Sequence, residues 1–73
     1  MWIKAYNGCL VNSRSLCGIV YNFDSGVYFV KGIEAAYDNE LHQQGQWNLG
    51  EFESKELAME FINNLYTRLN NDN

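Results

Sequence analysis

Residues 21–30, YNFDSGVYFV, place strand-forming aromatic and aliphatic residues on either side of Asp24-Ser25-Gly26. Aromatic and β-branched residues favour strands. Glycine adopts the positive φ of tight hairpin turns without steric cost, and Asp and Ser are common turn residues. The segment therefore predicts a β-hairpin, from which the rest of the fold can be built.

The length of this turn decides which aromatic ring faces which side of the hairpin. A three-residue loop over 24–26 pairs Tyr21 with Phe29. A two-residue loop over 25–26 instead brings Tyr28 to the face of Tyr21 and sends Phe29 across, because side chains alternate along a strand. Under either register, apolar side chains remain on both faces.

Strand-like runs continue the hairpin in both directions. Upstream, 16–23 is rich in aliphatic and aromatic residues, and Gly18 marks a candidate bulge. Downstream, 27–37 is either one long bent strand or two short ones. The run 47–53 alternates in side-chain character, with Gly50 a second candidate bulge. A meander of antiparallel strands is therefore expected.

The N-terminal residues predict a second hairpin. Asn7-Gly8 is a strong turn signal, and it separates a strand at about 2–6 from one at about 9–12. The small polar residues of 13–15, SRS, then interrupt the strand pattern and predict a loop.

The segment 38–46, DNELHQQGQ, is polar and follows neither the strand nor the helix period, so it predicts the longest exposed loop. Asp38, Glu40 and His42 alternate within it and would point the same way from an extended backbone. They are candidate partner-binding residues. A metal site is not expected here, because structural zinc sites show paired Cys or His ligands.

The segment 54–69, SKELAMEFINNLYTRL, predicts a C-terminal helix. Ser54 is a suitable N-cap, and Arg68 lies near the negative end of the helix dipole. Residues 70–73 are expected to fray as a tail, which leaves 1–69 as a single domain. The apolar face of the helix comprises Leu57, Ala58, Phe61, Ile62, Leu65, Tyr66 and Leu69.

Composition narrows the class of protein. The 73 residues are 47% hydrophobic and 15% aromatic, which indicates a folded chain with a core. The net charge is −4 and the five basic residues are scattered, whereas nucleic-acid binders normally carry a basic stripe. Direct binding of nucleic acid is therefore not expected.

The opening MWIKAY carries no long apolar run, so neither a signal peptide nor a membrane span is expected, and we predict a cytoplasmic location. The two cysteines, Cys9 and Cys17, are too few for a disulfide scaffold. In a reducing compartment, buried free thiols are the expected state of both.

Together these elements predict an α+β fold, an antiparallel meander of four or five strands with one C-terminal helix packed on one face. A helix of about 16 residues is roughly 24 Å long and covers one face of a small sheet. The other face is left without intramolecular cover, unless the sheet curls enough to bury both faces on itself.

Both ends of the chain carry a resemblance. MWIK at the start, Gly8 followed by Leu10-Val11-Asn12, and the closing LGEFESKELAMEFINNLY resemble small uncharacterised proteins of Gram-positive bacteria and their phages. Those proteins begin with a Met-Trp-Ile-basic strand and end with a Leu-Gly-acidic-aromatic strand that runs into a helix. The resemblance covers about half of the chain, and none of its motifs specifies a functional site. It implies a mobile-element setting, in which short acidic proteins often bind and block a larger host protein.

No catalytic or cofactor signature is present, so we expect neither an enzyme nor a bound cofactor. The six glycines are dispersed rather than grouped in a phosphate-binding loop. Cys9 or Cys17 beside His42 would lack a third, orienting residue. An uncovered apolar sheet face instead indicates a protein partner. The candidate partner-binding residues are Val20, Tyr28, Phe29, Asp38, Glu40 and His42.

The main hypothesis is therefore a non-catalytic protein-binding module that inhibits a host protein by covering its surface. Two alternatives remain. A structural or regulatory homodimer would cover the open face with a second copy. An acidic mimic of nucleic acid would block a basic groove with a rim of carboxylates from Glu34, Asp38, Glu40, Glu51 and Glu53.

Overall fold

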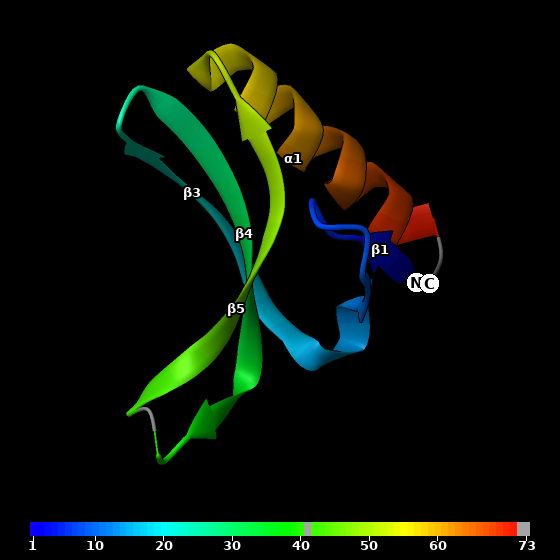
Figure 1. Cartoon of the computed structure of the whole chain (residues 1–73). Helices are drawn as coiled ribbons and strands as arrows, with labels where there is room; N and C mark the ends of the chain where they lie inside the picture. The colour runs from blue at the N-terminus through cyan, green and yellow to red at the C-terminus, as the bar shows by residue number, and fades with distance from the viewer. Residues whose placement is uncertain (41, 72–73) are drawn as a thin grey trace.

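The computed structural model describes residues 1–40 and 42–71, without the side chains at positions 37 and 38. Within these residues, five strands and a C-terminal helix follow one another (Figure 1), which confirms the predicted α+β class. β1 and β2 form a two-stranded sheet, and the other three strands form a meander of order β3-β4-β5. The elements are β1 Trp2–Lys4, β2 Leu10–Asn12, the 3₁₀ turn η1 Ser13–Ser15, β3 Leu16–Asp24, β4 Val27–Asp38, β5 Gln43–Phe52 and α1 Lys55–Asn71.

The β3–β4 hairpin has the shorter of the two predicted turns. Ser25 and Gly26 have φ values of 53° and 82°, the two positive angles that a two-residue hairpin turn of type I′ requires. Asp24 pairs with Val27, and the ladder continues from there, so the three-residue loop is excluded. Val30 consequently lies opposite Tyr21 and is fully buried.

The long loop predicted for 38–46 is wrong, because 43–46 belongs to β5. Asp38 pairs with Gln43, and Ile33 pairs with Gln46, so β4 and β5 continue as a two-stranded arm. In Figure 1 this arm extends beyond the layer that α1 covers. The main chain of the arm is hydrogen-bonded between the two strands, but its side chains do not pack in the core. A strand outside the core need not alternate apolar and polar residues, so its sequence shows no apolar period.

Two register shifts lie where glycines interrupt the strand patterns. In β3 the ladder shifts between Leu16 and Gly18, and in β5 Leu49 is the extra residue between Asn48 and Gly50. Gly18 and Gly50 were both predicted as candidate bulges, and each lies at a bulge. The second bulge places Leu49 in the core, where it is almost completely buried.

The N-terminal hairpin forms as predicted, with shorter strands and a longer turn. Trp2 pairs with Asn12, and the Gly8 N–H donates to the Ala5 carbonyl at 2.9 Å. Gly8 has φ 93°, so a three-residue turn with glycine in the left-handed position replaces the expected two-residue Asn-Gly turn. The turn docks on the sheet because the Tyr6 N–H donates to a β5 carbonyl, that of Asn48, at 2.8 Å.

The helix begins at the predicted cap. The Leu57 N–H donates to Ser54 Oγ at 3.3 Å, as an N-cap serine requires. The helix ends at Asn71, two residues inside the segment that was expected to fray, and positions 72–73 lie outside the described residues. Its apolar face is narrower than predicted, since Leu57 is 48% exposed and Tyr66 is 64% exposed. The helix packs on β4 and β5, and the stripe that meets them does not include these two residues.

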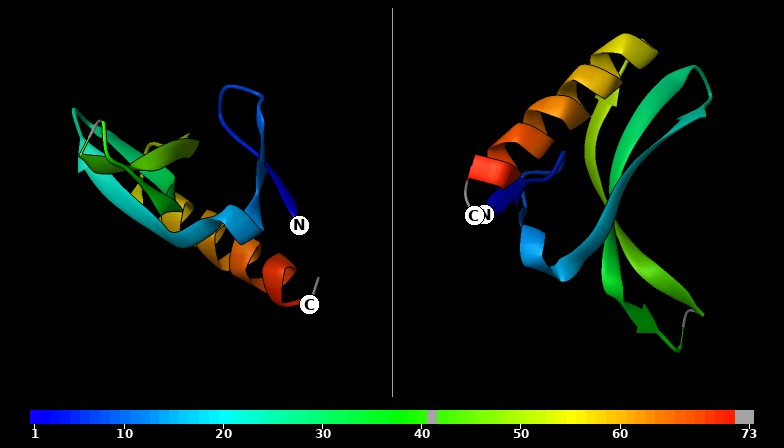
Figure 2. Two further views of the ribbon diagram at one scale, coloured as in Figure 1. Left: turned by 90° about the horizontal axis from the view of Figure 1, so that it is seen from below. Right: turned by 180° about the vertical axis from the view of Figure 1, so that it is seen from behind.

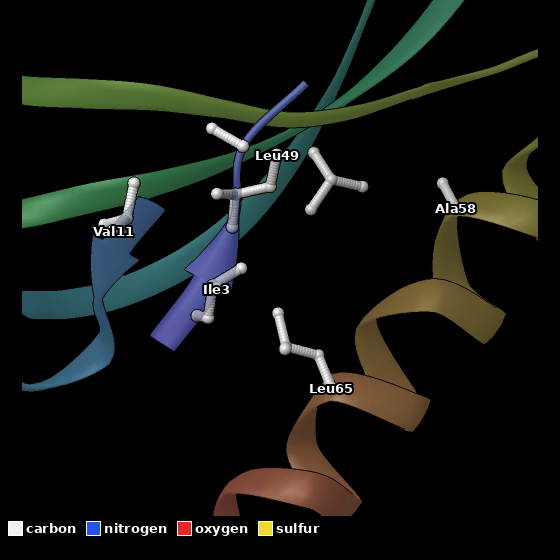
Figure 3. Packing of buried hydrophobic residues seen from close by; sticks show 7 residues of the cluster. Ile3, Val11, Leu49, Ala58 and Leu65 are labelled. Carbon is white, nitrogen blue, oxygen red and sulfur yellow. The ribbon is translucent and has the colours of Figure 1, made fainter. Parts of the chain in front are cut away.

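The core lies between the three-stranded sheet on one side and the helix with the N-terminal hairpin on the other (Figures 1 and 2). Figure 3 shows side chains from both hairpin strands, β5 and α1 converging on this layer. Each contributing strand supplies one buried hydrophobic side chain, and the helix supplies two. The buried members are Ile3, Ala5, Val11, Val30, Leu49, Ala58 and Leu65.

Two leucines on one helix test this assignment. Leu65 is 3% exposed, so Leu65→Ala is expected to lower the free energy of unfolding by about 3 kcal/mol, the transfer and cavity cost of a core leucine. Leu57→Ala removes the same atoms from an exposed position and is expected to change stability by less than about 0.5 kcal/mol. Urea titration followed by circular dichroism measures both, and equal losses would contradict the assignment.

The hairpin turn provides a second test. Asn accepts a left-handed backbone better than Ser, so Ser25→Asn is expected to raise the free energy of unfolding by about 0.5 kcal/mol. A β-branched residue is strained at positive φ, so Ser25→Val is expected to lower it by about 1 kcal/mol. Thermal unfolding distinguishes the two variants, and a stabilising Ser25→Val would rule out the two-residue turn.

Candidate functional site

The face of the sheet that points away from the helix, termed the open face, is the first candidate surface. Pairing of β3 with β4 places Val20 beside Lys31 and Asn22 beside Phe29 on this face. Pairing of β4 with β5 places Glu51 on the other flank of Phe29, on the same face. The helix and the N-terminal hairpin both lie on the other side of the sheet (Figure 2). The open face therefore carries Val20 and Phe29 among polar and charged side chains, and no described element covers it.

A hollow of about 310 Å³ marks the middle of the open face. Phe29 is the aromatic member of its lining, and the ammonium nitrogen of Lys31 lies 5.8 Å from the centre of that ring. This is a favourable cation–π distance. The hollow is lined by Asn22, Asp24, Phe29, Lys31, Gln46 and Asn48.

Tyr28 lies on the opposite side of the sheet from Phe29, among aromatic rings. Its ring centre is 4.7 Å from that of Phe23 and 6.4 Å from that of Tyr21. The Lys55 ammonium of the first helical turn lies 6.0 Å from the Tyr21 ring. Tyr21, Phe23 and Tyr28 form what is here termed the β3 aromatic cluster, and Phe23 is 60% exposed.

Sequence reasoning missed this second exposed set of rings because it assigned the whole helix-side face to the helix. The helix packs on β4 and β5, and the aromatic cluster extends onto β3, the edge strand. The narrow width of a single helix was the available signal. A single helix is only about 10 Å wide, so one edge of a three-stranded sheet is left outside its cover.

The predicted loop residues lie far from both surfaces. Glu40 and His42 are exposed in the connection between β4 and β5, and His42 has φ 56°. This connection follows β4, at the opposite end of that strand from the β3–β4 turn (Figure 1). The side chain of Asp38 lies outside the described residues. The structure thus brings Val20 and Phe29 together, and separates both from Tyr28, Glu40 and His42.

The carboxylates proposed as a nucleic-acid mimic do not form one rim. Glu34 faces the helix side, where its Oε1 accepts a hydrogen bond of 2.6 Å from Trp47 Nε1. Glu51 lies on the open face, where it accepts from the Asn48 side chain at 3.0 Å. Two members of the set therefore point to opposite sides of the sheet, and one of them is used in internal packing.

Both cysteines are free thiols, and the expectation that they are buried is wrong. Cys17 is the extra residue of the β3 bulge, so its side chain is not carried into the core. Its sulfur lies 3.8 Å from the Glu34 carbonyl oxygen and 3.8 Å from Gln44 Nε2. Cys9 follows the N-terminal turn and is likewise exposed. Within the described residues, no three His, Cys, Asp or Glu side chains converge as metal ligands would.

The described part of the chain holds no helix with both the length and the apolar character needed to cross a bilayer. No protein-family model matches the chain, no curated protein matches it significantly, and neither does any solved structure.

The Glu34–Trp47 contact yields a test of whether Glu34 is structural. Glu34→Ala removes a charge-assisted hydrogen bond to a half-buried indole, so a loss of about 2 kcal/mol in unfolding free energy is expected. Glu34→Gln keeps an acceptor at the same position and is expected to lose less. Urea unfolding measures both. If Glu34→Ala leaves the free energy of unfolding unchanged, the carboxylate has no structural role and could belong to the acidic rim.

Proposed function

We propose that the chain is a non-catalytic protein-binding module that binds its partner through the open face. The observation that carries the proposal is the uncovered hollow around Phe29, with polar groups of three strands at its border. Protein interfaces combine aromatic anchors at the centre with a polar border that excludes water. The open face has this distribution of side chains.

The rigidity of the site supports the same proposal. Phe29 and Lys31 lie on β4, the central strand, which is paired on both sides. A partner that binds there does not need to order the backbone first, which lowers the entropic cost of association. Val20 on the neighbouring strand is 47% exposed and extends the apolar area beside the hollow.

The proposed role is that of an accessory or inhibitory protein of a phage or related mobile element, acting in the cytoplasm. Such a protein would act by occupying the working surface of a larger host protein. The mild acidic excess, with net charge −4, is compatible with a protein partner and unsuited to direct contact with nucleic acid. The separation of Glu34 from Glu51 favours this role over nucleic-acid mimicry.

Affinity capture from a Gram-positive bacterial lysate tests the proposal. Wild-type protein is expected to retain a specific protein, and Phe29→Ala to weaken that complex by about 2 kcal/mol, the effect of truncating an interface anchor. Gln46→Arg alters an exposed residue at the border of the hollow and is expected to weaken it without affecting folding. Leu57→Ala, on the helix, is the matched control that keeps the partner.

Salt and folding measurements complete this experiment. Circular dichroism establishes that each variant is folded before its binding is compared. An apolar contact is expected to survive an increase in NaCl, whereas an electrostatic mimic would release its target as the charges are screened. A partner that both open-face variants retain, or that leaves with salt, would contradict the proposed surface.

A further inference from the structure

Within the described ranges, no strand lies beside the outer edge of β3. β3 is the first strand of the order β3-β4-β5, and among the described residues β4 is the only element that pairs with it. On the opposite edge of the sheet, the Asn48 carbonyl of β5 accepts a hydrogen bond from the Tyr6 N–H. Natural proteins protect exposed edges with lysine, proline or short strands. β3 is nine residues long, has no proline, and carries only one charged residue, Asp24 at its end.

A groove of about 320 Å³ follows the first half of this edge on the helix side. It lies between the start of β3 and the C-terminal half of α1, and it is termed here the β3–α1 groove. Tyr66, one of the most exposed large side chains of the helix, stands at its wall. The apolar side chains of its lining are Leu16, Cys17, Ile19, Ile62, Tyr66 and Leu69.

The other half of β3 carries a projecting ring on the same side of the sheet. Phe23 lies opposite Tyr28, which packs against the core from the helix side, so Phe23 faces that side too. It is 60% exposed. One strand thus has an unpaired backbone edge, an apolar groove at its start and an exposed aromatic ring at its end.

We propose that a second copy of this chain covers this surface by pairing its own β3 antiparallel with β3. The two-fold axis passes through the sheet near Val20 and Tyr21, the middle of the strand. A two-fold axis perpendicular to a sheet keeps the helix sides of both copies together. Phe23 of each copy then lies opposite 17–19 of the other and enters the β3–α1 groove there.

The charges of the strand fit the same arrangement. Asp24 of one copy lies opposite 16–18 of the other, close to Arg14 of the preceding turn. The two Asp24 carboxylates are at opposite ends of the shared ladder, more than about 20 Å apart at 3.4 Å per residue. Within β3 itself, no like charges face each other, and every outward amide and carbonyl at the centre of the strand gains a partner. A foreign strand would need to supply its own ring and charge in this spacing, whereas a second copy has both.

The result is a six-stranded sheet, a common size for a twisted open sheet. The two open faces join into one surface across the axis. The dimer uses the β3 edge and the helix side of the sheet, so it can form whether or not a partner binds the open face.

Sedimentation of the purified chain tests the dimer. Wild-type protein is expected to be dimeric at high micromolar concentration. Phe23→Ser is expected to raise the dissociation constant at least about 30-fold, the effect of removing an interface anchor. Val20→Lys places like charges opposite each other near the axis and is expected to be monomeric. A mixture of Val20→Lys and Val20→Glu is expected to restore a dimer.

The control for these variants is Leu10→Lys, which makes an exposed apolar residue of β2 basic and is expected to remain dimeric. Circular dichroism verifies that each variant is folded. A wild-type chain that is monomeric at millimolar concentration would overturn the proposal. A dimer that persists in both Phe23→Ser and Val20→Lys would overturn it as well.

The native thiols provide a readout that requires no substitution. Cys17 lines the β3–α1 groove, whereas Cys9 lies on the N-terminal hairpin, and both are exposed in the single chain. Alkylation of Cys17 by iodoacetamide is expected to slow as the protein concentration rises through the dissociation constant. The rate of Cys9 alkylation is expected to stay the same over this range of protein concentration. Equal rates for the two thiols in a chain shown to be dimeric would place the interface elsewhere.

Discussion

Pairing of β3 with β4 through the Ser25-Gly26 turn is the constraint on which the remaining structure depends. The turn sets the register, and the register places Val30 in the core with Phe29 on the other face. Because side chains alternate along a strand, a slip by one residue would exchange the two faces throughout β4. The buried layer of helix, hairpin and sheet would then meet Phe29 and Lys31 instead of Val30.

The described helix and N-terminal hairpin cover only one side of the three-stranded sheet. A domain of this length buries roughly 60% of the surface that its unfolded chain exposes. One helix and one short hairpin supply the second layer, and they leave both the open face and the edge of β3 outside it. The surfaces proposed for a partner and for a second copy are those that this helix and hairpin leave uncovered.

The sequence predicted the elements with the most local information and failed where tertiary contacts override local signals. Ser54 caps the helix, Gly18 and Gly50 lie at bulges, and Gly8 has the positive φ of a turn. The segment 43–46 is a strand because β4 pairs with it, although its own side chains carry no strand period. The two cysteines were expected to be buried, but a bulge and a turn hold them at the surface.

Composition and local propensity alone determined the α+β class, the order of the elements and the presence of an uncovered face. The physical reason is that turn chemistry, capping and apolar periodicity act over a few residues and are written in them. Only the tertiary structure decided between the two registers that the turn sequence allows, and it also decided the side of the sheet that receives Tyr28 and the strand left as an edge. Those outcomes depend on which long-range pairing buries the most apolar surface, and residues such as Val30 and Leu65 meet only in the folded chain.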